Sequence, residues 1–109
     1  MIKWYNEHSG NYFNNKFRQV LLQFNNEIIE KAILEIKRMN KKWGSCTPSG
    51  KIIINPEIIK APSKCIEYVM VHELCHIKYP NHGKEFYSLL EKLIPDWKRW
   101  KDRLEKIMV

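Results

Sequence analysis

The chain has 109 residues, a formal net charge of +7 and 44% hydrophobic residues. This length predicts a single domain over residues 1–109 and excludes the second lobe of larger hydrolases. No stretch approaches 18 uncharged apolar residues, and no signal-peptide core precedes the first helix, so we expect a soluble cytoplasmic protein that does not enter a membrane. The lysines are spread along the whole chain, which favours a solvated basic surface over a nucleic-acid-binding patch.

The first half of the chain predicts one helix and a small sheet. Apolar residues recur at three- and four-residue steps over about residues 12–30, which indicates an amphipathic helix with an aromatic stripe in the core. The segment after Ala32 fits a helix or a strand almost equally. We favour a strand from about Ile33, because a turn signal at residues 47–50 and a β-branched run at residues 51–54 follow it. These segments predict an antiparallel hairpin.

The second half predicts three helices separated by prolines. A central helix is expected from about Lys64 to Lys78, with Ser63 as its cap and Glu67 close to the capping-box position. Pro80 ends it, and Pro95 divides the two helices that follow. Apolar stripes mark these last helices, at Phe86, Leu89, Leu90 and Leu93 in one and at Trp97, Trp100, Leu104 and Ile107 in the other.

The central helix carries the sequence His72-Glu73-Leu74-Cys75-His76, an H-E-x-x-H motif. Residues four apart share one helix face, so both imidazoles can bind one metal ion, and Glu73 can reach a water molecule beside it. Both histidines border the helix's apolar arc, and Glu73 falls between His76 and that arc, partly shielded from solvent. The motif therefore predicts a zinc-dependent hydrolase with Glu73 as general base. The alternative is an ordinary amphipathic helix with two surface histidines.

A catalytic zinc usually takes three protein ligands and leaves a fourth position open. His82, just beyond the corner at Pro80, is the main candidate for the third ligand, against a surface histidine that caps a helix. Among the histidines only His8 competes with it, and His8 lies near the N-terminus, whereas Glu85 and Glu91 are the fallbacks. The group that stabilises the oxyanion stays open among Asn55, Tyr79 and Tyr87.

The three cysteines, Cys46, Cys65 and Cys75, form no C-x-x-C pair, and their odd number argues against a disulfide framework. We expect reduced thiols. Cys75 projects away from His72 on the helical wheel, which makes it a packing residue more than a metal ligand.

Three motifs together resemble one known family. The W-G-S-C sequence at Trp43–Cys46, H-E-L-x-H at His72–His76 and N-H-x-x-x-F at Asn81–Phe86 are similar to the YgjP-like zinc metallopeptidase domain, and the short chain resembles the minigluzincins. The similarity covers about residues 33–105. It implies a gluzincin-like peptidase with one Zn²⁺ held by His72, His76 and His82, and with Glu73 as general base.

The resemblance also implies an α+β fold, with a small antiparallel sheet packed on the zinc-binding helix between an N-terminal helix and C-terminal helices. The edge strand of that sheet could line the cleft and bind a peptide substrate by β-addition. Minigluzincins are associated with latency through their C-terminal segments. Residues 95–109 could therefore form a hinged helix that covers the cleft, exchanges with a second subunit in a homodimer, or simply completes the core.

Two other functions compete with a free-standing peptidase. The spacing from His76 to His82 equals that of the metzincins, but Tyr79 stands where their turn glycine belongs, which argues against that family. The H-E-L-C-H sequence also resembles the SprT-like and WLM proteins, so a DNA-associated protease or DNA-binding module is the alternative. DNA binding that weakens steeply as salt rises would support it. An inactive metal-binding fold that regulates a partner is the third reading.

Overall fold

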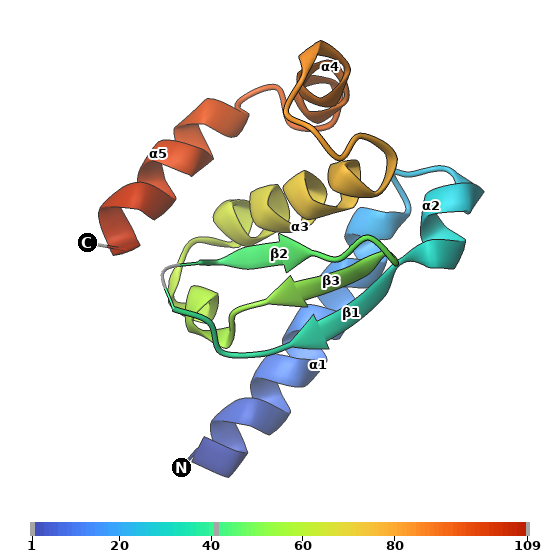
Figure 1. Cartoon of the computed structure of the whole chain (residues 1–109). Helices are drawn as coiled ribbons and strands as arrows, with labels where there is room; N and C mark the ends of the chain where they lie inside the picture. The colour runs from blue at the N-terminus through green and yellow to red at the C-terminus, as the bar shows by residue number, and fades with distance from the viewer. Residues whose placement is uncertain (1, 41, 109) are drawn as a thin grey trace.

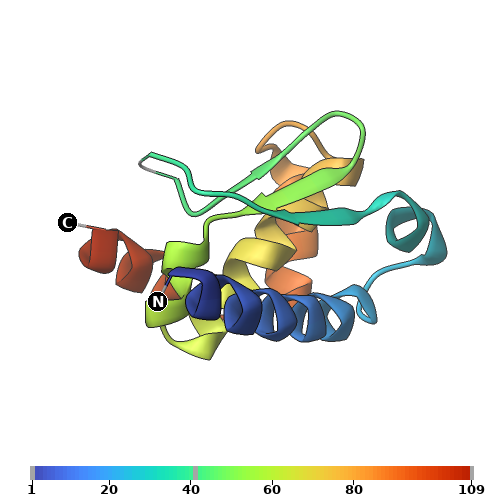
Figure 2. The same cartoon turned by 90° about the horizontal axis from the view of Figure 1, so that it is seen from below.

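The computed structural model describes residues 2–40 and 42–108, and the side chains of residues 11–40 and 42–107. Within this part the chain has the predicted α+β class. Its elements are α1 (Ile2–Leu21), α2 (Asn26–Lys31), β1 (Ile33–Ile36), β2 (Gly44–Cys46), β3 (Lys51–Ile54), the 3₁₀ helix η1 (Pro56–Lys60), α3 (Ser63–Lys78), α4 (Lys84–Leu93) and α5 (Trp97–Met108). The sheet lies across one side of α3 (Figure 1), and α1 packs on the opposite side (Figure 2).

The sheet is mixed, which corrects the expectation of an antiparallel sheet. The strand order is β1-β3-β2. The strand from Ile33 was expected to pair antiparallel with residues 51–54, but β1 pairs parallel to β3 with Ile33 opposite Lys51. The antiparallel partner of β3 around the turn at residues 47–50 is β2, a short strand that the sequence analysis did not predict. The reason is the connection from β1 to β2, described at residues 37–40 and 42–43, because it joins strands on opposite edges of the sheet. β2 is therefore an edge strand, and its second edge faces away from β3.

Asn55 holds this crossing loop in place. Its side-chain amide donates hydrogen bonds to the carbonyl oxygens of Met39 (3.0 Å) and Lys42 (2.9 Å), and its Oδ1 accepts one from the Glu57 amide at 3.1 Å. Asn55 is also buried. A buried side chain with all of these groups engaged is a structural residue, so Asn55 is not available as the oxyanion donor that the sequence left open.

The helix predicted over residues 12–30 is two helices. α1 ends at Leu21 and α2 begins at Asn26, because the Oδ1 of Asn25 accepts a hydrogen bond from the Ile28 amide (3.1 Å) and caps a new helix. The predicted apolar stripe is nevertheless correct. Its buried members are Phe13, Phe17, Val20, Phe24 and Ile28.

α3 lies at the centre of the molecule, in contact with α1, the sheet, α4 and α5. It begins at Ser63, but Ser63 does not cap it; Pro62 occupies the capping position and no side chain bonds to the first turn. The Ser63 hydroxyl instead accepts a hydrogen bond from the Lys16 ammonium, which also pairs with Glu67 at 3.2 Å. These contacts tie the start of α3 to α1.

α4 and α5 follow α3 as predicted, divided by Pro95. α4 buries Phe86 and Leu90, and α5 buries Leu104 against α3. Among the helices described, none is long and apolar enough to cross a membrane.

Candidate metal centre

α3 presents His72 and His76 on one face, one helical turn apart. Their ring centroids lie 5.0 Å apart, and both side chains are partly exposed. The apolar residues of the same helix turn inward; Ile66, Val69, Met70 and Leu74 are buried and Ile77 is partly buried. The histidines therefore sit at the border between the core and solvent, where the helical pattern placed them.

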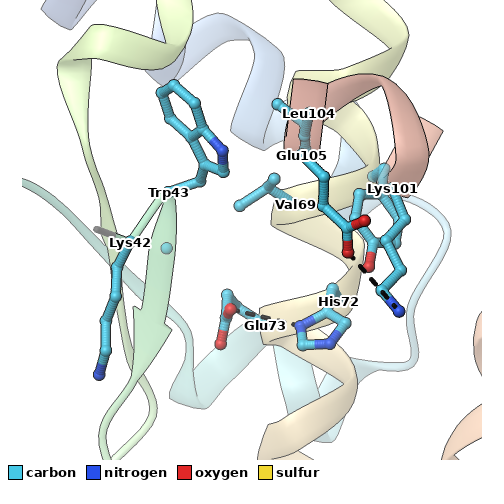
Figure 3. A pocket seen from close by; sticks show the side chains of 10 residues that line it. Lys42, Trp43, Val69, His72, Glu73, Lys101, Leu104 and Glu105 are labelled. Carbon is cyan, nitrogen blue, oxygen red and sulfur yellow. Dashed lines mark hydrogen bonds and ion pairs between the residues drawn. The ribbon is translucent and has the colours of Figure 1, made fainter. Parts of the chain in front are cut away.

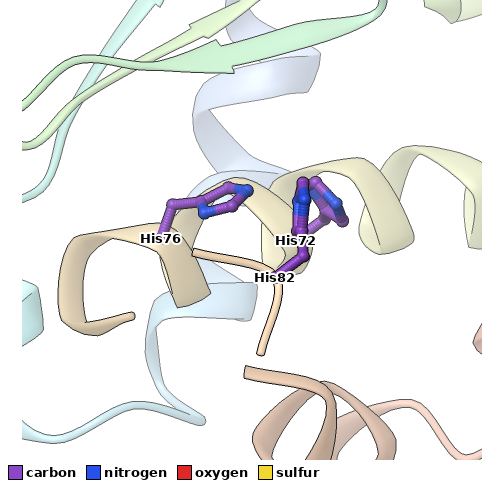
Figure 4. Close-up of side chains that lie close together, drawn as sticks. All are labelled: His72, His76 and His82. Atoms are coloured by element: carbon purple, nitrogen blue, oxygen red, sulfur yellow. The ribbon is translucent and has the colours of Figure 1, made fainter. Parts of the chain in front are cut away.

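His82 joins these two histidines from the loop between α3 and α4. Its ring centroid lies 4.5 Å from that of His76 and 5.2 Å from that of His72. Each of the three residues offers one ligand atom such that all three atoms lie within 4.8 Å of one another, and Figure 4 shows the side chains gathered beside α3. Three imidazoles in this arrangement form a donor set of the kind that binds zinc.

The orientation of the α3 histidines is set by their Nδ1 atoms. The Nδ1 of His76 lies 3.2 Å from the carbonyl oxygen of Tyr79, and the Nδ1 of His72 lies 3.3 Å from Oε2 of Glu73. An imidazole that donates from Nδ1 to such an oxygen keeps the lone pair on Nε2 for a metal. Both contacts accommodate the tautomer with the proton on Nδ1, which leaves Nε2 of each residue available to a metal ion.

Phe86 on α4 packs against all three imidazoles. Its ring centroid lies 5.1 Å from His72, 4.6 Å from His76 and 4.9 Å from His82, and the side chain is fully buried. A buried aromatic ring in contact with three imidazoles limits the rotamers that the histidines can adopt. In the N-H-x-x-x-F motif, the candidate third ligand, His82, thus precedes by four residues the phenylalanine that packs against its ring.

The surroundings of His82 favour its neutral form. Burial lowers the pKa of His82, and the neighbouring His76 and His72 lower it further. A neutral imidazole is the form that binds a metal ion. The lowered pKa of His82 therefore acts in the direction that favours metal binding.

The two cysteines nearest to the site remain protonated at neutral pH. Burial, followed by the negative charge of Glu73, raises the pKa of Cys46 to about 11 and that of Cys75 to about 12. Metal binding requires the thiolate, so these thiols are poor ligands here. All three cysteines are free, and Cys75 is buried in the core, which agrees with the predicted packing role.

Glu73 lies where β2 meets α3. Its side chain is only 11% exposed. β2 comes very close to α3 at this point. A β-carbon on Gly44 would lie 2.7 Å from Cγ1 of Val69 and 3.2 Å from Cγ of Glu73. A glycine is therefore needed at position 44, and it brings the edge strand directly beside the carboxylate.

Two neighbouring cavities open beside Glu73, and both are lined by Lys42, Gly44, His72 and Glu73. The ligand-side cavity has a volume of about 500 Å³ and continues along residues 45–48 past His76 and His82. The α5-side cavity, drawn in Figure 3, has a volume of about 310 Å³. Its further walls are Trp43, Tyr68, Val69, Lys101, Leu104 and Glu105.

Tyr68 is a cleft residue that the sequence analysis missed. It precedes His72 by one helical turn, its ring centroid lies 5.7 Å from the His72 ring, and the side chain is buried. Its ring also stacks on Trp97 of α5 (6.5 Å), which stacks on Tyr87 of α4 (5.3 Å). The four-residue spacing from Tyr68 through His72 to His76 was the available signal, since these positions share one face.

The remaining sequence candidates lie elsewhere. Tyr79 contributes its carbonyl oxygen to His76, and Tyr87 lies with its ring 6.1 Å from that of His82. Glu85 and Glu91 are exposed on α4, and neither joins the histidine group in the part of the chain that is described. The side chain of His8 falls outside the described residues.

Comparison with known proteins agrees with this geometry. The model of the YgjP-like metallopeptidase domain matches residues 1–107. The chain belongs to this family. The resemblance seen in its sequence motifs is thereby confirmed, and membership implies a hydrolase that cleaves peptide bonds with the help of a metal ion.

Solved structures confirm the fold. Jannalysin of Methanocaldococcus jannaschii, a metallopeptidase zymogen, is similar with a TM-score of 0.75 and 20% identity over 89% of this chain and 97% of that one. Abylysin of Pyrococcus abyssi, also a metallopeptidase zymogen, gives a TM-score of 0.67 and 20% identity over 88% and 91% of the two chains. No curated protein matches the sequence.

Proposed function

We propose that this single-domain protein is a zinc endopeptidase in which His72, His76 and His82 hold one Zn²⁺ and Glu73 is the general base. One observation carries the proposal: three imidazole donors within 4.8 Å of one another lie beside a carboxylate that is almost fully buried. Zinc held by three neutral imidazoles supplies Lewis acidity, which polarises a carbonyl group and lowers the pKa of water toward about 7.

Glu73 moves the proton in this proposal. Its carboxylate accepts a proton from the attacking water and delivers it to the amine of the departing peptide. The carboxylate oxygen Oε2 of Glu73 contacts Nδ1 of His72 at 3.3 Å. Gly44 lies against the same side chain, because a β-carbon at Gly44 would be 3.2 Å from Cγ of Glu73. Both contacts restrict the side chain to a position between the histidines and the edge strand.

The edge of β2 is the proposed binding surface for the peptide substrate. The Trp43 carbonyl accepts a hydrogen bond from the Asn55 amide (2.9 Å), and the Thr47 amide donates one to the Lys51 carbonyl (2.9 Å). These backbone groups of Trp43 and Thr47 therefore point toward the β3 side of the hairpin. Backbone groups alternate along an antiparallel strand, so those of Gly44 and Cys46 point to the free edge. Because that edge borders the ligand-side cavity, a substrate strand added there would pass Glu73.

α5 is the element that would regulate this site. Lys101, Leu104 and Glu105 line a cavity together with His72 and Glu73, so α5 narrows one side of the cleft. We propose that residues 95–109 restrict access in the full-length chain, either within one molecule or by exchange in a homodimer. Shortening the chain after Pro95 should then raise casein cleavage, with zinc content as the check on folding. Unchanged cleavage would show that α5 completes the core and does not restrict access to the site.

Substitution of the general base tests the central proposal. Glu73→Gln should lower peptide cleavage by about 10²–10⁴-fold, while elemental analysis still finds one zinc ion per chain. Glu30→Gln, which alters an exposed carboxylate on α2, is the matched control and should retain full activity. Peptidase activity that survives in the Glu73 variant would show that another group is the base.

A further inference from the structure

We propose that α5 carries an interaction surface for anionic lipid bilayers, and that binding there moves α5 away from α3 and opens the cleft. The proposal rests on the peptidase function above and names the partner that relieves the restriction by α5. Figure 1 shows α5 at the rim of the molecule, beside α3.

The exposed face of α5 is cationic. Five of its side chains carry a positive charge and two carry a negative charge. Arg99, Arg103 and Lys106 follow one another at steps of four and three residues, so they share one face of the helix. All three are exposed, and none forms an ion pair within the described part of the chain. Unpaired cations on one face attract a surface of opposite charge.

The other face of α5 completes the pattern of a helix that lies along a bilayer surface. Its apolar stripe consists of Trp97, Trp100, Leu104 and Ile107. A rotation of about 100° per residue places Lys101 and Arg103 on the two borders of this stripe. Helices that lie at bilayer surfaces combine an apolar stripe with lysine and arginine on the polar face, and tryptophan prefers the boundary between water and hydrocarbon.

The attachment of α5 to α3 includes few buried groups. Leu104 is buried, whereas Trp97, Trp100 and Ile107 are only partly buried against the core. The Nε1 atom of Trp100 is buried without a hydrogen-bond partner among the described residues. An unpaired buried donor destabilises the docked position, and a bilayer surface supplies water and carbonyl oxygens that accept from an indole. A competing surface can therefore displace α5 from α3.

A bilayer fits α5 better than a nucleic acid does. Both present phosphate groups to the cationic face. Only a bilayer also offers an apolar region to the stripe once it leaves α3, whereas a nucleic acid would leave the two indoles and Leu104 in water. A partner shifts an equilibrium only through its different affinity for the two states. The released helix binds a bilayer through both faces, and the docked helix binds it through charge alone.

Movement of α5 would change the proposed active site directly. Three α5 residues line the α5-side cavity together with His72 and Glu73, namely Lys101, Leu104 and Glu105. The ring of Trp97 stacks on that of Tyr68 (6.5 Å), which in turn lies 5.7 Å from the His72 ring. Release of α5 removes all of these contacts from one side of the cleft. A bilayer should therefore raise cleavage, as shortening the chain after Pro95 should.

Vesicle binding tests the surface without turnover. The zinc-loaded full chain should bind phosphatidylcholine vesicles that contain about 30% phosphatidylserine at least about 10-fold more tightly than vesicles of phosphatidylcholine alone. Arg99→Gln combined with Lys106→Gln should weaken this binding by at least about 10-fold. The matched control is Arg18→Gln combined with Lys37→Gln, which removes the same charges from exposed positions on α1 and after β1. This control should weaken binding by less than about 2-fold.

Two further measurements follow the apolar stripe and the cleft. Brominated phosphatidylcholine in the same vesicles should quench the tryptophan emission, because bromine quenches indoles that enter the lipid. Trp97→Phe combined with Trp100→Phe should abolish this quenching. The anionic vesicles should also raise casein cleavage by at least about 3-fold in the wild type and in the Arg18 and Lys37 control, but not in the Arg99 and Lys106 variant.

The outcomes separate this inference from the proposed function. Equal binding to both kinds of vesicle, equal losses in the two charge variants, or binding without quenching would overturn the inference. Tighter binding to a short DNA duplex than to anionic vesicles would assign the cationic face to nucleic acid and overturn it as well. Cleavage that depends on Glu73 but ignores vesicles would keep the peptidase and remove the regulation by lipid. Binding and quenching without any cleavage would keep the surface and remove the peptidase.

Discussion

α3 and α5 both line the cleft, yet the structure holds them in different ways. α3 contacts α1, the sheet, α4 and α5, and nine of its sixteen residues are buried. Of the α5 residues described, Leu104 alone is buried, and the rest of the helix is mostly charged and exposed. Glu73 and two of the proposed ligands, His72 and His76, thus lie on the most constrained helix, whereas the residues that shape access lie on a helix attached by one stripe.

The largest effect should come from Phe86, which supports the histidines of α3. Phe86→Ala should lower the free energy of unfolding by about 3–5 kcal/mol, because a fully buried ring is lost, and should also weaken zinc binding. Urea denaturation of the zinc-free protein measures the first effect. Leu22→Ala, at an 82% exposed site, is the control and should change little. A loss below about 1 kcal/mol for Phe86→Ala would mean that the rings have other support.

Gly44 tests the contact between the edge strand and α3. Gly44→Ala should cost about 1–3 kcal/mol, because the added β-carbon meets Val69 and Glu73, and cleavage should fall as Glu73 moves. Removing the opposing methyl groups with Val69→Ala should reduce the cost of the glycine substitution in the double variant. Simple additivity in thermal and urea denaturation would contradict the close approach.

Cys75 should make the stability of α3 sensitive to alkaline pH. Its pKa is about 12 in the folded protein, against 9.0 as the ordinary value. Below pH 9 the thiol is protonated in both states, so its contribution is complete there. As the pH rises, the unfolded chain ionises first, and the free energy of unfolding should fall by about 1 kcal/mol by pH 10. Comparing wild type with Cys75→Ala across this range isolates the effect, and parallel curves would exclude it.

The smallest effect is expected on α5. The Lys101–Glu105 pair has side chains that are 53% and 64% exposed, so Lys101→Ala and Glu105→Ala should each change stability by at most about 0.5 kcal/mol. Urea denaturation of both variants and of the double variant checks this. A loss above about 1 kcal/mol would show that α5 is anchored by more than its apolar stripe.

The sequence allowed the helices and the metal-binding face to be predicted because these depend on local periodicity. The H-E-x-x-H spacing and the apolar arc predicted which face of α3 carries the histidines. Pro80 predicted where α3 ends and the chain turns toward His82. The break at residues 22–25 was missed because the apolar stripe continues across it from Phe24 to Ile28. The parallel pairing of β1 was also missed, because strand order depends on how a loop crosses the sheet.

The contacts that shape the site come from residues distant in sequence. Gly44 is required by Val69 and Glu73, which lie on another element, and no pattern around residue 44 reports their distance. Tyr68 and Leu104 line one cavity from two helices for the same reason. Such positions follow from packing, whereas His72 and His76 follow from spacing along one helix.

The stack from Tyr68 through Trp97 to Tyr87 gives the protein an optical probe of its own site. The Tyr87 ring contacts both neighbours, with centroid distances of 5.3 Å to the Trp97 indole and 6.1 Å to the His82 ring. Indole emission responds to charge and ring motion nearby, so a cation captured by the histidines should alter the intrinsic fluorescence. Occupancy of the centre can thus be titrated in solution without a dye or a substrate.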